Sequence, residues 1–157
     1  MRKRLLSATK EPAIEDGGEW IDLNTLAEVE ITSEDPGHPI ESALLAGGGP
    51  GWRAGTPGRQ VIRLLFSPVQ RLTQVQLRFE ERETVRTQQY ALRWLAEGDQ
   101  AGHEIVRQQY NFSPGGAAVE LENHQVDLDA VAVLELTIEP DIGNPAAFAS
   151  LERMRVR

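Results

Sequence analysis

The sequence of 157 residues contains no cysteine. This absence excludes disulfide bonds, thiolate nucleophiles and zinc–thiolate centres. Lysine is almost missing too, because it occurs only at Lys3 and Lys10, so arginine carries nearly all the positive charge. Sixteen basic against 24 acidic residues leave a formal net charge of -8, which opposes binding to nucleic acid or to an anionic bilayer. The arginine guanidinium groups remain suited to bind a carboxylate or a sugar locally.

Long apolar runs are also absent. No segment approaches the roughly 20 apolar residues of a membrane span. The start, MRKRLLSATK, has a basic head but only a two-leucine patch, whereas a secretory signal needs roughly 7 to 15 apolar residues. These features predict a cytoplasmic location. Residues 1–19 lack periodicity and are expected to form a loosely held tail, and the length predicts a single domain over residues 20–157.

Two-residue alternation of apolar and polar side chains recurs along that domain. In LTQVQLRFE, for example, Val75, Leu77 and Phe79 face one way and the polar residues face the other. About eight strands are expected in all, at residues 27–32, 59–66, 72–80, 85–94, 103–112, 117–123, 130–139 and 150–157. Turn signals are expected to separate them at residues 67–68, 97–99, 113–116, 127–129 and 141–145. The pattern predicts an all-β fold, an antiparallel β-sandwich or jelly roll.

The stretch HPIESALLAGGGPGWRAGTPG interrupts the strand pattern. Pro39 suits a first helical turn and the glycine run ends it, so one short helical turn is expected near residues 39–46. The glycines resemble a phosphate-binding loop only superficially. A Walker loop needs Gly-Lys-Ser/Thr, and a dinucleotide loop follows a strand and opens a helix. Here the loop follows a helix and opens a strand, so the glycines are expected to serve a tight turn.

Signals for catalysis are weak, and we expect no enzyme. The sequence has no Gly-x-Ser-x-Gly elbow, and the three histidines, His38, His103 and His124, lie in separate segments. Pairs of carboxylates occur at strand ends, where acidic residues are common, and the separation that glycoside hydrolysis requires is not encoded in sequence spacing.

Few aromatic residues are present, and their positions differ in kind. Trp94, Tyr90 and Phe79 alternate along strands and are expected in the core. The candidate ligand contacts lie at loop boundaries instead: Trp52, Arg53, His38, Tyr110 and Asn111. An aromatic ring packs on the C–H face of a sugar while Arg, Asn or His donors bind its hydroxyls. Corner packing of Trp52 is the alternative interpretation.

The order of segments resembles that of discoidin-like (coagulation factor type C) domains, which are galactose-binding-like. The resemblance rests on AEVEITSEDPGHPIESALLAGGGPGWRA, RQVIRLLF and QRLTQVQLRFE, then on YALRWLAEGDQAGHEIVRQQYNF and AVAVLELTIEPDIGNPAAFASLERMRV. It covers about residues 20–157. It implies an eight-stranded sandwich whose end loops bind sugars, lipids or proteins, and many bacterial members are carbohydrate-binding modules.

The resemblance therefore implies a non-catalytic module with a carbohydrate ligand, or else a protein-interaction domain; it leaves the oligomeric state open. Family members often hold a structural calcium with an Asp-Gly pair after the helical turn. Here that stretch reads LLAGGGPG, and only Glu152 matches a carboxylate of the closing strand. One such ligand is too few for a calcium site by itself, so no cofactor is expected and Glu152 stays the one candidate metal ligand.

Overall fold

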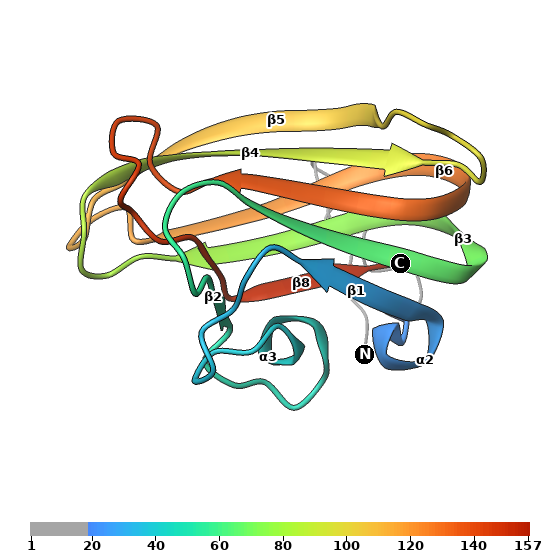
Figure 1. The fold of residues 1–157 in the computed structure, drawn as a ribbon, viewed down its shortest axis with the longest axis horizontal. Helices are drawn as coiled ribbons and strands as arrows, with labels where there is room; N and C mark the ends of the chain where they lie inside the picture. Colours follow the sequence, from blue (N-terminus) through green and yellow to red (C-terminus); the bar gives the residue numbers. More distant parts are fainter. Residues whose placement is uncertain (1–18) are drawn as a thin grey trace, which may run out of the picture.

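Two strands of 21 residues each, β3 (Gln60–Glu80) and β6 (Val119–Glu139), organise the fold (Figure 1). The structure, a computed structural model, describes residues 19–157; the expected tail therefore lies outside the described residues except for Glu19. The other elements are α2 (Leu23–Leu26), β1 (Ala27–Ile31), α3 (Glu41–Leu44), β2 (Trp52–Arg53), β4 (Arg86–Leu95), β5 (His103–Phe112), β7 (Ser150–Leu151) and β8 (Arg153–Val156). None of the helices in residues 19–157 has the length and apolar character to span a membrane.

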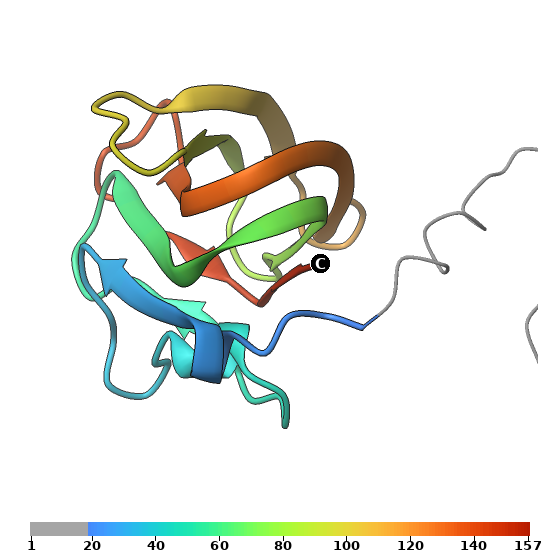
Figure 2. The ribbon, with the colours of Figure 1, turned by 90° about the vertical axis from the view of Figure 1, so that its right-hand side faces the viewer.

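Both long strands bend, so each contributes to two layers of a sandwich (Figures 1 and 2). The first half of β3 pairs with β1 on one side and with the second half of β6 on the other. That half of β6 also pairs with β4, and β4 pairs with β5. The second half of β3 pairs with the first half of β6 and with β8. A separate ribbon joins β2 to β7. Every one of these pairs is antiparallel, and the expected all-β sandwich is confirmed.

Two of the expected turns are bends inside strands. Residues 67–68 lie within β3 and residues 127–129 within β6, and the pairing of the two strands shifts register between Leu65 and Gln74. Bulges of this kind bend a strand while its neighbour follows, so the backbone hydrogen bonds resume beyond the bend. At these two positions, the turn-forming residues mark bends and not strand ends.

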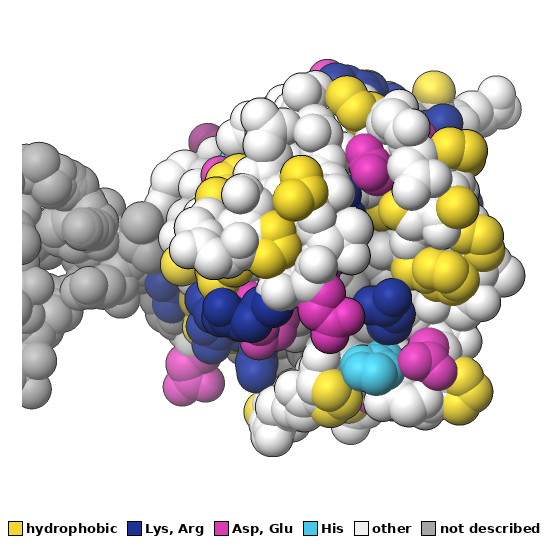
Figure 3. Space-filling view, turned by 90° about the vertical axis from the view of Figure 1, so that its left-hand side faces the viewer, with side chains coloured by type: hydrophobic (Ala, Val, Ile, Leu, Met, Phe, Trp, Pro, Cys, Tyr) yellow, Lys and Arg dark blue, Asp and Glu magenta, His cyan; other side chains and the backbone are white. Residues whose placement is uncertain are grey.

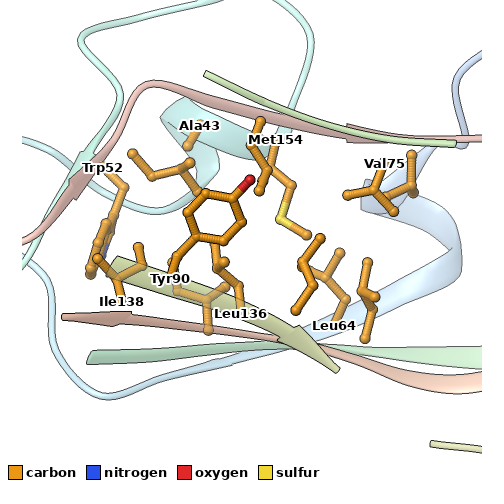
Figure 4. Packing of buried hydrophobic residues seen from close by; sticks show 14 of the residues in the cluster. Ala43, Trp52, Leu64, Val75, Tyr90, Leu136, Ile138 and Met154 are labelled. Atoms are coloured by element: carbon orange, nitrogen blue, oxygen red, sulfur yellow. The ribbon is translucent and has the colours of Figure 1, made fainter. Parts of the chain in front are cut away.

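The apolar residues that alternate along β3, β4 and β6 meet between the two layers. Leu64 and Val75 of β3 and Leu136 and Ile138 of β6 are fully buried (Figure 4). Phe79 and Tyr90 stack with ring centroids 5.3 Å apart, and Trp94 is partly buried against the same cluster. The expectation that Phe79 and Tyr90 belong to the core is confirmed, whereas Trp94 packs against the core from its margin.

Short helical segments close one edge of the sandwich. The expected turn near residues 39–46 is α3, and Ala43 inserts from it into the core. A second helix, α2, was not anticipated. Asp22 caps it by accepting from the Asn24 backbone N–H at 3.1 Å and from the Thr25 hydroxyl at 2.7 Å. An Asp followed by polar residues was the local signal for this cap.

Candidate functional site

Loops from distant parts of the sequence gather at the end of the sandwich where β3 finishes. Backbone hydrogen bonds hold them to β2: Asp35 donates to the Arg53 carbonyl at 2.8 Å, Arg53 donates to the His38 carbonyl at 3.2 Å, and Ala54 donates to the Ala149 carbonyl at 2.9 Å. Trp52–Arg53 in β2 therefore lies between the loop of residues 32–39 and the loop that precedes β7.

Two neighbouring depressions lie on this end and share Arg53. The first has a volume of about 160 Å³ and is bordered by His38, Glu80 and Glu152. The second has a volume of about 340 Å³ and extends from Asp35 past Arg53 to Phe148. Figure 3 shows this end of the molecule, where acidic, basic, histidine and apolar side chains lie beside one another. The surface formed by both depressions is called the loop-end site below.

Arg53 and Phe148 give the loop-end site its aromatic component. The guanidinium carbon of Arg53 lies 5.6 Å from the centre of the Phe148 ring, and Phe148 is 37% exposed. Such a contact fixes the guanidinium over the ring by cation–π attraction. An apolar ring and a fork of N–H donors are thus presented together to solvent.

His38 and Asp35 form the second part of this surface. His38 Nδ1 lies 3.0 Å from Asp35 Oδ2, and both side chains are 39% exposed. The hydrogen bond from His38, followed by that from the Gly37 backbone, holds the pKa of Asp35 below its usual value. Asp35 is thus an ionised acceptor, and it orients the His38 ring beside the depression.

Arginine side chains form ion pairs with Glu80 and Glu152, the two glutamates that line the smaller depression. Arg78 bonds Glu152 through Nε and Glu80 through Nη2, and Arg82 also reaches Glu80 at 3.3 Å. Burial raises the pKa of Glu80, but the hydrogen bonds from Arg78 and Arg82 outweigh it, so the net shift is downward. This network keeps Glu80 ionised and fixes the positions of both glutamate side chains.

The prediction that Trp52 contacts a ligand is wrong. Its side chain is 1% exposed, its ring lies at one end of the apolar core (Figure 4), and its Nε1 donates to the Ser33 carbonyl at 3.0 Å. The indole has no face left for a ligand, so the corner-packing alternative is correct. Arg53, the next residue along β2, points outward because side chains alternate along a strand.

Tyr110 and Asn111 do not join the loop-end site. Tyr110 is half-buried between the layers, where its hydroxyl donates to the Val119 carbonyl at 2.9 Å. Asn111 is exposed and accepts from the Thr87 hydroxyl across the strand pair at 2.9 Å. As successive residues of β5 they face opposite ways, and neither borders the depressions around His38 and Arg53.

Glu152, the candidate metal ligand, has the Arg78 guanidinium as its partner. Its Oε1 accepts a hydrogen bond from Arg78 Nε. Within residues 19–157, no three His, Asp or Glu side chains cluster closely enough to hold a metal ion.

Sequence reasoning missed three members of the site: Phe148, Asp35 and Glu80. A lone aromatic residue in the loop DIGNPAAFAS was the available signal for Phe148, and the turn Asp-Pro-Gly before His38 was the signal for Asp35. Nothing local marks Glu80, because only the packing of β3 against β8 brings it to Glu152 through Arg78.

Comparison of structures places this architecture among known modules. A carbohydrate-binding module of family 32 from AlyQ, solved with 4,5-unsaturated mannuronic acid, is 15% identical with a TM-score of 0.61, the match covering 89% of this chain and 98% of that one. The fold is that of the galactose-binding-like modules. The resemblance to discoidin-like domains is thereby confirmed for the fold.

Two further modules show the same likeness. A pectin-binding carbohydrate-binding module is 13% identical with a TM-score of 0.60, over 85% of this chain and 91% of that one. The family 32 module of Clostridium perfringens NanJ, solved with galactose, is 15% identical with a TM-score of 0.57, over 87% and 96%. No protein-family model and no curated protein matches the sequence.

Proposed function

We propose that this galactose-binding-like domain is a non-catalytic carbohydrate-binding module that takes its ligand at the loop-end site. The observation that carries the proposal is the pairing of Arg53 with Phe148 beside two depressions on an end built from loops. The Phe148 ring would pack on the C–H face of a sugar, and Arg53 would donate to its hydroxyls. The His38 ring and the Asp35 carboxylate add a donor or acceptor at the other side of Arg53.

The charge states at this site favour binding over catalysis. The acid catalyst of a glycoside hydrolase needs a carboxyl group whose pKa is raised. The pKa values of Asp35 and Glu80 are both held below their usual values by hydrogen bonds from His38 and from Arg78 and Arg82. Neither carboxyl group is suited to donate a proton to a leaving group near neutral pH.

The solved modules with this fold give independent support. The AlyQ module was solved with an unsaturated mannuronic acid, the NanJ module with galactose, and a lectin domain of lectinolysin with Lewis B antigen. These ligands are all saccharides, and they differ from one another. The fold therefore supports the ligand class, while the side chains at the loop-end site must select the sugar.

The test is a titration of the full chain with a panel of neutral and acidic mono- and oligosaccharides, followed by amide NMR shifts. We expect shifts confined to residues 34–38, 52–55 and 147–150. Phe148→Ala and Arg53→Ala should each weaken binding by about tenfold, the factor that corresponds to about 1.4 kcal/mol. Leu121→Ala and Arg71→Ala are matched controls, because these side chains are exposed and border neither depression.

The proposal fails if no sugar moves the loop amides at millimolar concentration, or if Phe148→Ala and Arg53→Ala bind as the unaltered chain does. Light scattering and pull-down with the same variants would then assess the alternative, a protein partner. Loss of partner binding only in Phe148→Ala would assign the exposed ring to a protein interface instead.

A further inference from the structure

A larger depression, of about 500 Å³, lies on the other side of the glycine loop. Its walls come from Trp20 near the start of the described chain, from Leu44 and Leu45 at the end of α3, and from Arg153 and Arg155 of β8. The volume falls within the range of about 300 to 1,000 Å³ that is typical of small-ligand pockets. We call this the β8 pocket. It shares no lining residue with the loop-end site.

The alternation of β8 places the arginines in this pocket. Met154 and Val156 are fully buried, so Arg153 and Arg155 point away from the core. The beginning of the described chain lies beside β8 (Figures 1 and 2), and Ile21 N–H donates to the Val156 carbonyl at 2.8 Å. The centre of the Trp20 ring lies 4.8 Å from the guanidinium carbon of Arg155 and 4.2 Å from that of Arg157.

In the part of the chain that the structure describes, few acidic groups offset the positive charge of the β8 pocket. Within residues 19–157, neither Arg153 nor Arg155 forms an ion pair with a carboxylate, and Arg155 donates only to the Gln76 amide oxygen, at 2.9 and 3.2 Å. Among residues 19–157, Asp22 is the one carboxylate in the pocket wall, and it is engaged in capping α2. Burial, followed by the charges of Arg153 and Arg157, lowers the pKa of Arg155.

Neighbouring guanidinium groups in a half-buried wall repel one another, and this repulsion is relieved when an anion binds between them. A planar carboxylate matches the guanidinium fork in two parallel hydrogen bonds. The remaining wall is apolar at Leu44 and Leu45, and it would stay uncovered by a bare inorganic ion. A ligand that fits must combine a carboxylate with a compact body that has C–H surface.

We propose that the β8 pocket is a second binding site, which takes the carboxylate of a sugar acid through Arg153 and Arg155 while the sugar ring lies against Leu44 and Leu45. Trp20 acts as a positioning residue, because its ring holds the Arg155 guanidinium in place. The β8 pocket is separate from the loop-end site, so an experiment can refute binding at one of them without refuting binding at the other.

The experiment is an NMR titration of the full chain with galacturonate, with galactose as the uncharged match and with inorganic phosphate as an anion that lacks a sugar ring. We expect galacturonate to shift the amides of residues 20–24, 44–46 and 153–156, and galactose to leave these amides unmoved. Raising the ionic strength from about 0.05 to about 0.3 M should weaken binding, because screening acts on the ion pair.

Arg153→Gln is the decisive variant, because Arg153 makes no side-chain hydrogen bond within residues 19–157 and its loss should leave the fold intact. It should weaken galacturonate binding by about tenfold, as expected for the loss of charge-assisted hydrogen bonds. Arg155→Lys keeps the positive charge but removes the planar guanidinium that can form two parallel hydrogen bonds to a carboxylate. It should also weaken galacturonate binding. Arg107→Ala, which removes an exposed arginine of β5, should bind galacturonate as the unaltered chain does.

Three results would overturn the proposal: no shift in these amides with galacturonate, equal binding in Arg153→Gln and the unaltered chain, or shifts with phosphate as large as those with galacturonate. The last result would make the pocket a general anion site without a preference for a sugar acid. Sugar binding that survives Arg153→Gln but not Arg53→Ala would support the loop-end site and refute this one.

Discussion

Glu120 is a carboxyl group in the interior of the sandwich, and it is only 2% exposed. Gln88 donates to its Oε1 at 3.4 Å, whereas its Oε2 has no partner within residues 19–157. The pKa of Glu120 is raised to about 8, chiefly by burial and then by the neighbouring Glu122, and these effects outweigh the lowering by Gln88 and Arg86. The folded protein therefore holds a proton on Glu120 at neutral pH.

This proton makes folding stability depend on pH. The unfolded carboxyl group has a pKa near 4.5, below the folded value of about 8. Because the folded state binds the proton more tightly, its contribution to stability is complete below pH 4.5 and is lost as the pH rises to about 8. Glu120→Gln keeps a neutral side chain at every pH. It should flatten the decline and raise Tm at pH 8.5 by about 2–4 °C for each kcal/mol regained.

Thermal melts at pH 5 and pH 8.5 measure this effect. Glu104→Gln is the control, because that carboxylate is 44% exposed on β5 and should change the pH dependence little. A decline of Tm between the two pH values that is as steep in Glu120→Gln as in the unaltered chain would contradict the assignment.

At the scale of elements, the loop of residues 45–51 links α3 to β2 through glycines with two different roles. Gly51 has φ of +83°, and a Cβ there would lie 2.8 Å from Glu152 Cα and 2.9 Å from the Leu151 carbonyl oxygen. Gly47 has φ of +102°, but a Cβ there would meet nothing within 4 Å. The first position is constrained by conformation and by packing, the second by conformation alone.

Replacing each glycine by alanine should therefore lower the free energy of unfolding by different amounts. Gly47→Ala should destabilise by about 1 kcal/mol, as expected for a non-glycine residue at positive φ. Gly51→Ala should cost about 3 kcal/mol or more, because the β7–β8 junction must also move. Urea unfolding of both variants measures the two free energies. Equal losses would show that the contact with Glu152 adds nothing to the requirement for positive φ.

At the scale of the whole molecule, the fold brings arginine side chains to the carboxylates at the loop-end site. Arg78 bridges Glu152 of the closing segment to Glu80 at the end of β3. These hydrogen bonds raise the pKa of Arg78, with that to Glu152 contributing most, so the guanidinium stays charged at any working pH. It supplies a fixed cation between β3 and the residue that precedes β8.

Metal removal should therefore leave the fold unchanged. We expect Tm to stay within about 1 °C when the protein is treated with EDTA or supplied with calcium in millimolar excess. A cation that bound only the folded state would instead raise Tm by mass action. Differential scanning calorimetry of the full chain in both conditions provides the measurement. A rise in Tm with calcium that disappears in Glu152→Gln would show that a calcium ion competes with Arg78.

The amino-acid sequence determined the fold class, since two-residue alternation and turn residues are local consequences of how strands expose their faces. It located most strands, the helical turn at α3 and the aromatic residues Phe79 and Tyr90 in the core. It did not distinguish a bend from a turn at residues 67–68 and 127–129, because both use the same residues and only the pairing of β3 with β6 carries the strands through.

Only the tertiary structure decided which side chains meet. In the sequence, Trp52 and Arg53 look like one ligand-binding pair, but one faces the core and the other faces solvent, and Phe148, 95 residues beyond Arg53, supplies the exposed ring. Arg153 and Arg155 likewise become a pocket wall only because Trp20 and α3 fold against β8. Burial and partnership across long sequence separations arise from packing, and local spacing does not encode them.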